Sequence, residues 1–101
     1  MFYIYILQSK ISCHFYCGYS ANPWRRLIEH NTKPYNAYTS KYRPWTLAAV
    51  FESGELEREA IRVEKFIKMQ KSRKLIQKLV DPCFIPTGDL AQLVRVPHMR
   101  D

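Results

Sequence analysis

The hydrophobic pattern at the start of the chain predicts a β-hairpin. Residues 2–8 are rich in aromatic and β-branched side chains, which favour strands, and their alternation places Tyr5 and Leu7 on the same side. A mostly polar turn follows, and residues 13–18 form a second strand that ends at Gly18. The short connection favours antiparallel pairing of the two strands.

An asparagine–proline pair then marks the start of a helix. Asn22 can accept a backbone N–H as the cap, and Pro23 at the first helical position loses nothing by lacking its own N–H. We expect this helix to continue to about Asn31. Three apolar residues at helical spacing form its predicted buried stripe: Trp24, Leu27 and Ile28.

The rest of the pattern predicts one more strand and two more helices. The expected segments are mostly loop at 32–45, a strand at 45–51, a helix at 55–70 and a short helix at 72–80. The segment 81–101 holds three prolines and either packs back as an extended segment or is loose. The order strand, strand, helix, strand, helix, helix predicts an α/β (α+β) fold, a small three-stranded and mainly antiparallel sheet flanked by helices. Residues 1–80 form the expected domain, and 81–101 are an extension.

Composition and charge narrow the class of protein. The chain has 101 residues, enough for one domain with its own core. Lys and Arg exceed Asp and Glu by 16 to 9, and this net charge of +7 favours a polyanionic partner such as nucleic acid. The three cysteines form no metal-binding or disulfide pattern, and the N-terminal apolar run is too short to span a bilayer. We therefore expect a cytoplasmic protein with reduced thiols and no membrane partner.

Two pairs of residues could carry chemistry. Tyr5 and Tyr16 stand on the two predicted hairpin strands, where their phenol oxygens could converge; ordinary cross-strand aromatic packing is the alternative. Arg26 and His30 share one face of the first helix, roughly opposite its apolar stripe. This pair suits an anion, because arginine donates to phosphate in a fixed fork and histidine can shuttle a proton near neutral pH. A solvated helix face is the alternative.

Further charged residues could bind a metal ion or nucleic acid. Glu64 borders the apolar stripe of the long helix, where its carboxylate could ligate a hard divalent cation; a salt bridge to Lys68 is the alternative. The loop before the third strand carries Lys33, Lys41 and Arg43 among tyrosines. Basic groups with aromatics can grip a phosphate backbone and stack on bases, whereas the alternative is a generic solubilising loop.

Taken in order, these residues resemble the GIY-YIG endonuclease superfamily, over residues 2 to about 80. The first signature corresponds to Tyr3-Ile4-Tyr5 and the second to Tyr16-Cys17-Gly18, at a spacing typical of the family. The later positions that match the family pattern are Arg26, His30 and Glu64. The similarity is greatest to the small single-domain branch, often described as excinuclease-like.

The resemblance implies hydrolysis of one phosphodiester bond in DNA with a single Mg²⁺ or Mn²⁺, in repair or recombination. Glu64 would hold the metal against the phosphate, and Arg26 would neutralise the charge that develops on it. Tyr5 or Tyr16 would orient or deprotonate the attacking water. A phenol titrates near ~10, so it would need help from the metal or from His30 to act as a base at neutral pH.

Two signature positions depart from the family pattern. Tyr3 replaces a glycine and Cys17 replaces an isoleucine, but neither position supplies a catalytic side chain in the family. Two alternatives to an endonuclease therefore stay open. The chain could be a non-catalytic nucleic-acid-binding module with a nuclease fold, or a subunit that needs a protein partner for its specificity.

Overall fold

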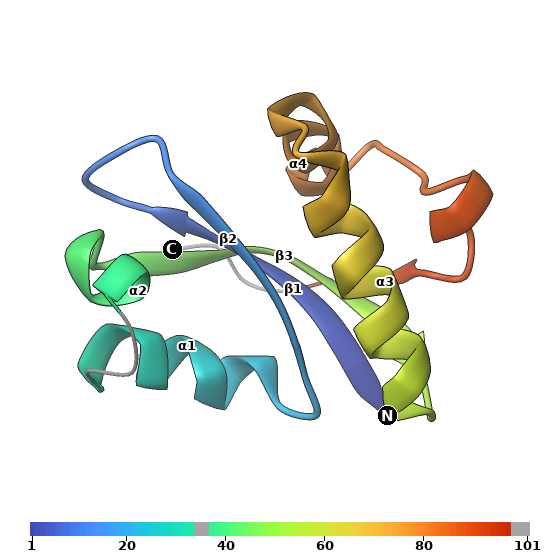
Figure 1. Ribbon diagram of the computed structural model, residues 1–101, viewed down its shortest axis with the longest axis horizontal. Helices are drawn as coiled ribbons and strands as arrows, with labels where there is room; N and C mark the ends of the chain where they lie inside the picture. Colours follow the sequence, from blue (N-terminus) through green and yellow to red (C-terminus); the bar gives the residue numbers. More distant parts are fainter. Residues whose placement is uncertain (34–36, 98–101) are drawn as a thin grey trace.

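The computed structural model describes residues 1–33 and 37–97, which form an antiparallel sheet with helices packed against it (Figure 1). In chain order the elements are β1 (Phe2–Ser9), β2 (Phe15–Ser20), α1 (Pro23–Thr32), α2 (Ala37–Lys41), β3 (Trp45–Gly54), α3 (Glu57–Gln70), α4 (Arg73–Val80), the 3-10 helix η1 (Gly88–Leu90) and β4 (Val94–Arg95). The predicted α+β class is confirmed, with four strands instead of three. No helix in the described part of the chain is long and apolar enough to cross a membrane.

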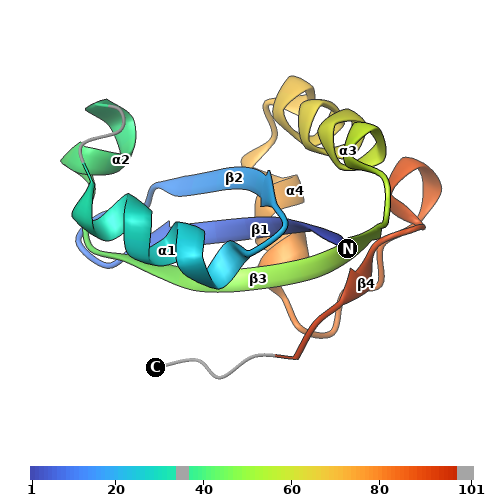
Figure 2. The ribbon, with the colours of Figure 1, turned by 90° about the horizontal axis from the view of Figure 1, so that it is seen from below.

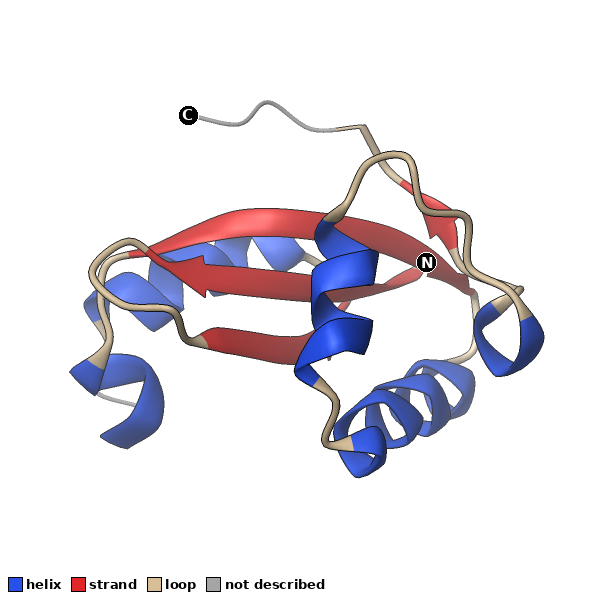
Figure 3. Cartoon of the chain, turned by 90° about the horizontal axis from the view of Figure 1, so that it is seen from above, coloured by secondary structure: helices blue, strands red, loops and turns tan. Residues whose placement is uncertain are grey.

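The central strand β1 separates two buried layers. The sheet order is β2-β1-β3-β4, so β1 is hydrogen-bonded on both sides. As the alternation predicts, Ile4 and Ile6 pack with residues of α3 and α4, whereas Tyr5 and Leu7 pack with Leu27 of α1. Figure 3 shows α1 and α4 on opposite faces of the sheet.

The edge strand β2 has helices beside it. In Figure 2, α2 and α3 both stand on the side of the sheet where β2 forms the edge. Helix α3 contacts all three long strands, and its residues Ala60, Val63 and Ile67 are buried at the predicted helical spacing. Side chains from α3 can therefore reach around β2 toward the face that α1 covers.

The helix starts lie where cap residues predict them. Asn22 Oδ1 accepts the backbone N–H of Arg25 at 3.0 Å, with Pro23 as the first helical residue. Ser72 Oγ likewise accepts the N–H of Leu75 at 3.1 Å at the start of α4. Capping side chains thus set the register of both short helices.

The predicted buried stripe of α1 was wrong for two of its three residues, since only Leu27 packs against the core. Trp24 and Ile28 are 43% and 62% exposed, whereas His30, expected on the opposite face, is fully buried. Helix α1 lies on the face of the sheet that carries the tyrosines of β1 and β2, and this polar aromatic surface can bury an imidazole through a hydrogen bond. Trp24 instead packs edge-to-face against Tyr3, with ring centroids 5.5 Å apart.

Other boundaries differ from the sequence expectations for identifiable reasons. Strand β2 passes through Gly18 and ends at Ser20, because this glycine serves close packing and not a turn. The segment expected to be mostly loop contains the short helix α2, with residues 34–36 outside the described part. Trp45 Nε1 donates to the carbonyl of Thr39 at 2.8 Å and so ties α2 to the start of β3.

The segment after α4 packs back onto the sheet. Leu90 and Leu93 are buried in the core that α3 and α4 form, and β4 pairs with the end of β3. Arg95 Nη2 donates to the carbonyls of Leu79 at 3.0 Å and Asp81 at 2.7 Å, and the guanidinium lies 4.7 Å from the centroid of the Phe51 ring. Arg95 thereby supplies donors to carbonyls at the C-terminal end of α4.

We expect Arg95→Ala to lower the free energy of unfolding by about 2 kcal/mol, because carbonyls at the C-terminal end of α4 lose a charged donor. Urea denaturation followed by circular dichroism measures this change. Arg58→Ala is the matched control, since Arg58 is exposed on α3 and should alter stability by no more than about 0.5 kcal/mol. Equal stability losses in the two variants would contradict the capping role.

Candidate active site

The ring of Tyr5 lies across the backbone of β2 at Gly18. These two residues are partners in the strand register. A Cβ at position 18 would come within 2.6 Å of both the Tyr5 Cζ and the Tyr5 hydroxyl oxygen, closer than a side chain tolerates. The missing side chain at Gly18 therefore determines where the Tyr5 ring can lie.

The hydroxyl of Tyr5 forms a buried hydrogen bond with His30 of α1. The Tyr5 oxygen and His30 Nε2 are 3.0 Å apart, and both side chains are almost completely buried. Burial lowers the pKa of His30 to about 4; the charges of Arg26 and Arg43 act in the same direction, and Glu29 opposes them. His30 is therefore neutral at pH 7, and a base this weak is poorly suited to take a proton there.

The guanidinium of Arg26 lies beside this pair. Burial raises the pKa of Tyr5 well above its ordinary value, and a hydrogen bond with Arg26 opposes the rise only in part. Arg26 Nη1 also lies 3.0 Å from Glu29 Oε1, and its side chain is 30% exposed. The guanidinium is thus held by Tyr5 and Glu29, on a side chain that is partly accessible to solvent.

Tyr16 brings a second phenol to the same place from the edge strand. It pairs with Leu7, diagonally next to Tyr5, and its ring centroid is 6.5 Å from that of Tyr5 and 4.8 Å from that of His30. Tyr16 is only half-buried, in contrast to Tyr5. Of the two tyrosines, Tyr16 is the one with access to solvent.

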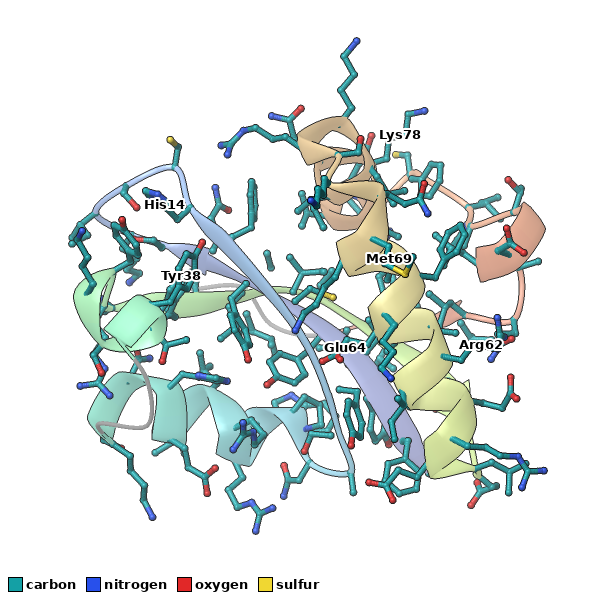
Figure 4. All side chains as sticks on the ribbon, viewed as in Figure 1. His14, Tyr38, Arg62, Glu64, Met69 and Lys78 are labelled. Atoms are coloured by element: carbon teal, nitrogen blue, oxygen red, sulfur yellow. The ribbon has the colours of Figure 1, made fainter. Side chains whose placement is uncertain are left out.

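Glu64 approaches from α3. Figure 4 shows its side chain directed from α3 toward the strands, whereas Arg62 points away from them. The Glu64 carboxylate is 17% exposed and lies 3.5 Å from the ammonium of Lys68, the salt bridge expected as the alternative. Lys68 Nζ in turn lies 5.4 Å from the centroid of the Tyr16 ring. Helix α3 thus brings an acid and a cation to the edge of β2.

These contacts connect all five predicted catalytic residues. The connected side chains, in order from α1 to α3, are Arg26, Tyr5, His30, Tyr16, Lys68 and Glu64. They come from four elements that are distant in sequence. The fold therefore gathers two phenols, a guanidinium and a carboxylate around the edge of β2.

The predicted nucleic-acid-binding cations have different surroundings. Lys33 and Lys41 are exposed, and Lys41 Nζ lies 5.4 Å from the Tyr42 ring centroid. Arg43 Nε donates to the carbonyl of His30 at 2.6 Å, and its Nη2 donates to the carbonyl of Lys33. Arg43 therefore caps the C-terminal end of α1, while phosphate contacts by any of the three remain a prediction.

Sequence reasoning missed two residues that position the site, Gly18 and Asn31, and expected a third, Lys68, only as the salt-bridge partner of Glu64. The strand register could have revealed Gly18 opposite Tyr5, and the four-residue spacing from Glu64 placed Lys68 near it. Asn31 gave no sequence signal: its amide group accepts the N–H of Trp45 at 2.7 Å and donates to the Trp45 carbonyl at 3.0 Å. This pairing fixes the end of α1, and with it His30, against the start of β3.

We expect the unfolding free energy to fall between pH 6.5 and 4 because of His30. The unfolded chain takes up the proton near the ordinary pKa, whereas the folded chain resists until about pH 4, so the unfolded state gains protons first. The difference amounts to roughly 3 kcal/mol over this range. It is checked by urea denaturation at each pH in wild type and in His30→Gln, whose curve should lack this component. Parallel curves would contradict the assignment, and NMR titration of the imidazole provides an independent reading.

Comparison with known proteins places the chain in a family. The profile described as the GIY-YIG catalytic domain matches residues 1–78. Two similar proteins of Neisseria meningitidis are UPF0213 protein NMC1807 from serogroup C / serotype 2a and UPF0213 protein NMB0361 from serogroup B. Each is 34% identical over 71 residues, which cover 67% of this chain and 77% of the relative. Because the matched range contains every residue of the connected site, the fold, the site and the sequence agree that this chain belongs to the GIY-YIG family of nucleases.

Proposed function

We propose that this protein is a divalent-metal-dependent endonuclease that hydrolyses phosphodiester bonds in DNA. The observation that carries the proposal is the connected series of side chains that runs from Arg26 on α1, by way of Tyr16, to Glu64 on α3. An anionic phosphate needs a donor of positive charge, an oriented water molecule and a neutralised leaving group, and these residue types supply the first two and a ligand for the third.

The residues fit a magnesium ion better than a metal held by the protein alone. Within residues 1–33 and 37–97, no group of three or more His, Cys, Asp or Glu side chains could enclose a metal. Mg²⁺ is commonly held by one or two carboxylates together with waters and substrate phosphate oxygens, so Glu64 alone is sufficient on the protein side. When bound, Mg²⁺ would supply Lewis-acid stabilisation of the phosphate and the departing oxygen.

The chain's own residues would bind the phosphate, orient the attacking water and position these groups. The Arg26 guanidinium, on a side chain that is partly accessible to solvent, would donate to the phosphate oxygens as their charge grows. Tyr16 would orient the attacking water, because it is the tyrosine with access to solvent. Tyr5 would position Arg26 through their hydrogen bond.

A non-catalytic nucleic-acid-binding module is the second candidate. It is favoured by the salt bridge between Glu64 and Lys68, which occupies the one carboxylate that the reaction requires. Binding of duplex DNA with a slope of about −0.9 per neutralised phosphate in log affinity against log salt, and no cleavage with any divalent ion, would support this candidate.

We expect Glu64→Gln to abolish Mg²⁺-dependent nicking of plasmid, flap and nicked DNA substrates. The neutral amide cannot hold the cation, yet losing the partly exposed pair with Lys68 should cost less than about 1 kcal/mol of stability. Glu59→Gln is the control, because Glu59 forms a similar pair with Arg62 on the same helix. Undiminished cleavage by purified Glu64→Gln would exclude the metal-binding role.

We expect Arg26→Ala to lower the cleavage rate by roughly 100- to 1,000-fold, as for other donors that act on developing charge. The rate is measured under single-turnover conditions with saturating enzyme, so that weaker binding does not enter. Arg25→Ala is the neighbouring control, since Arg25 is 65% exposed and on a different face of α1. Similar losses in both variants would show that Arg26 contributes only to the general positive field.

A further inference from the structure

A cavity of about 460 Å³ lies next to the candidate active site and is not used by the proposed mechanism. Its volume is within the range of roughly 300–1,000 Å³ typical of small-ligand sites. The walls come from the β1–β2 connection and β2, from α2, and from the ends of α3 and α4 that meet at Lys71 and Ser72. It therefore lies along the edge strand β2 and is bordered by residues of α2, α3 and α4.

One side of this cavity is aromatic. The aromatic side chains in its lining are His14, Phe15, Tyr16 and Tyr38. Figure 4 shows His14 and Tyr38 close together beside β2, with ring centroids 6.0 Å apart. Flat π-faces of this kind are the surfaces on which unpaired bases stack in proteins that bind single strands.

Basic side chains also line this cavity. Residues 65–78 contain six Lys or Arg and no Asp or Glu, and three of these cations line the cavity: Lys68, Lys71 and Arg73. In the described part of the chain, Lys68 pairs with Glu64, whereas no carboxylate lies within ion-pair distance of Lys71 or Arg73. Arg73 lies 5.1 Å from the Phe15 ring centroid and donates to the carbonyl of Cys13 at 2.6 Å, which holds its guanidinium over the aromatic wall.

The backbone at Lys71 is unusual. Lys71 ends α3 in the left-handed conformation with φ of 47°, where glycine or asparagine is normally preferred. A lysine here costs stability relative to glycine, so its presence calls for a reason outside the fold. A phosphate ligand at the rim of the cavity supplies that reason.

We propose that this cavity holds one unpaired nucleobase of the substrate strand, with the adjoining phosphates bound by Lys71 and Arg73. The inference rests on the proposed nuclease function and specifies its substrate. Because Tyr16 and Lys68 belong to both the cavity and the candidate active site, the captured base lies next to the phosphate that is cleaved. A base within a duplex is stacked and paired and cannot enter, so the substrate must present an unpaired base at that point.

The first experiment measures binding alone. Binding is measured by fluorescence anisotropy in EDTA, so that no cleavage intervenes. The three probes are a short single-stranded DNA oligonucleotide, its duplex, and the same strand with abasic positions. We expect the single strand to bind more tightly than the duplex, and abasic positions to weaken binding about tenfold. Equal binding of all three probes, or equally effective competition by polyglutamate, would overturn the proposal.

Two variants locate the effect in the cavity. Phe15→Leu keeps an apolar side chain but removes a π-face, and should lose about tenfold in affinity for the intact strand but little for the abasic strand. Lys71→Gly should raise or preserve the unfolding free energy while reducing the salt slope by about 0.7, one phosphate contact on a single strand. Lys78→Gln is the control, because it removes one positive charge as Lys71→Gly does. Lys78 lines a different cavity, so this substitution should not alter the preference for an unpaired base.

The outcome separates this inference from the proposed function. Cleavage of DNA without any dependence on unpaired or abasic positions would leave the nuclease intact and exclude the base-binding cavity. Base-dependent binding that Phe15→Leu removes, without cleavage under any divalent ion, would support the cavity and exclude the nuclease.

Discussion

The site depends on one close contact, the ring of Tyr5 against the backbone of Gly18. Because position 18 has no Cβ, the tyrosine ring can lie flat across the edge strand, and its hydroxyl reaches His30 on α1. This arrangement joins β1, β2 and α1 through uncharged groups, since burial keeps His30 neutral and disfavours ionisation of Tyr5. A rigid, uncharged set of contacts of this kind keeps the charged side chains around it in fixed positions, from which they can face a substrate.

Two helices place the charged side chains of the site around the Tyr5–His30 pair. Helix α1 contributes Arg26 on the face where Tyr5 lies, and α3 contributes Glu64 and Lys68 at the edge of β2. The Glu64–Lys68 pair holds a cation against the carboxylate in the absence of substrate. Any cation that binds the Glu64 carboxylate must displace that ammonium, so the same pair that stabilises the free protein opposes cation binding there.

The sequence correctly predicted features that depend on local chemistry. It did not predict features that depend on which elements pack together in the fold. Alternation in β1, the caps at Asn22 and Ser72 and the spacing of buried residues in α3 are local, and the structure confirms them. The buried face of α1 depends on what the helix meets, and a tyrosine-rich sheet buries His30 and leaves Ile28 exposed. Likewise, no local pattern in the tail predicts that it adds a fourth strand.

The candidate site shows the same difference between features set by local sequence and features set by packing. The order and spacing of five residues predicted them as the site, but what each side chain can do depends on burial, which spacing does not report. His30 was expected to shuttle protons, yet its burial gives it a pKa of about 4 and a hydrogen bond to Tyr5. The basic segment 65–78 escaped notice because the acidic residues before it offset its charge when the half-chain is counted as a whole.

The two departures from the family signature show why some positions can change without loss of the site. Cys17 points into the layer packed by α3 and α4, where burial raises its pKa to about 12 and the neutral thiol acts as a small apolar group. Tyr3 lies beyond the site, where its ring packs on Trp24. Both positions contribute packing, whereas Tyr5, Tyr16 and Gly18 contribute the hydroxyls and the space between them. The signature is therefore best understood by the direction in which each side chain points.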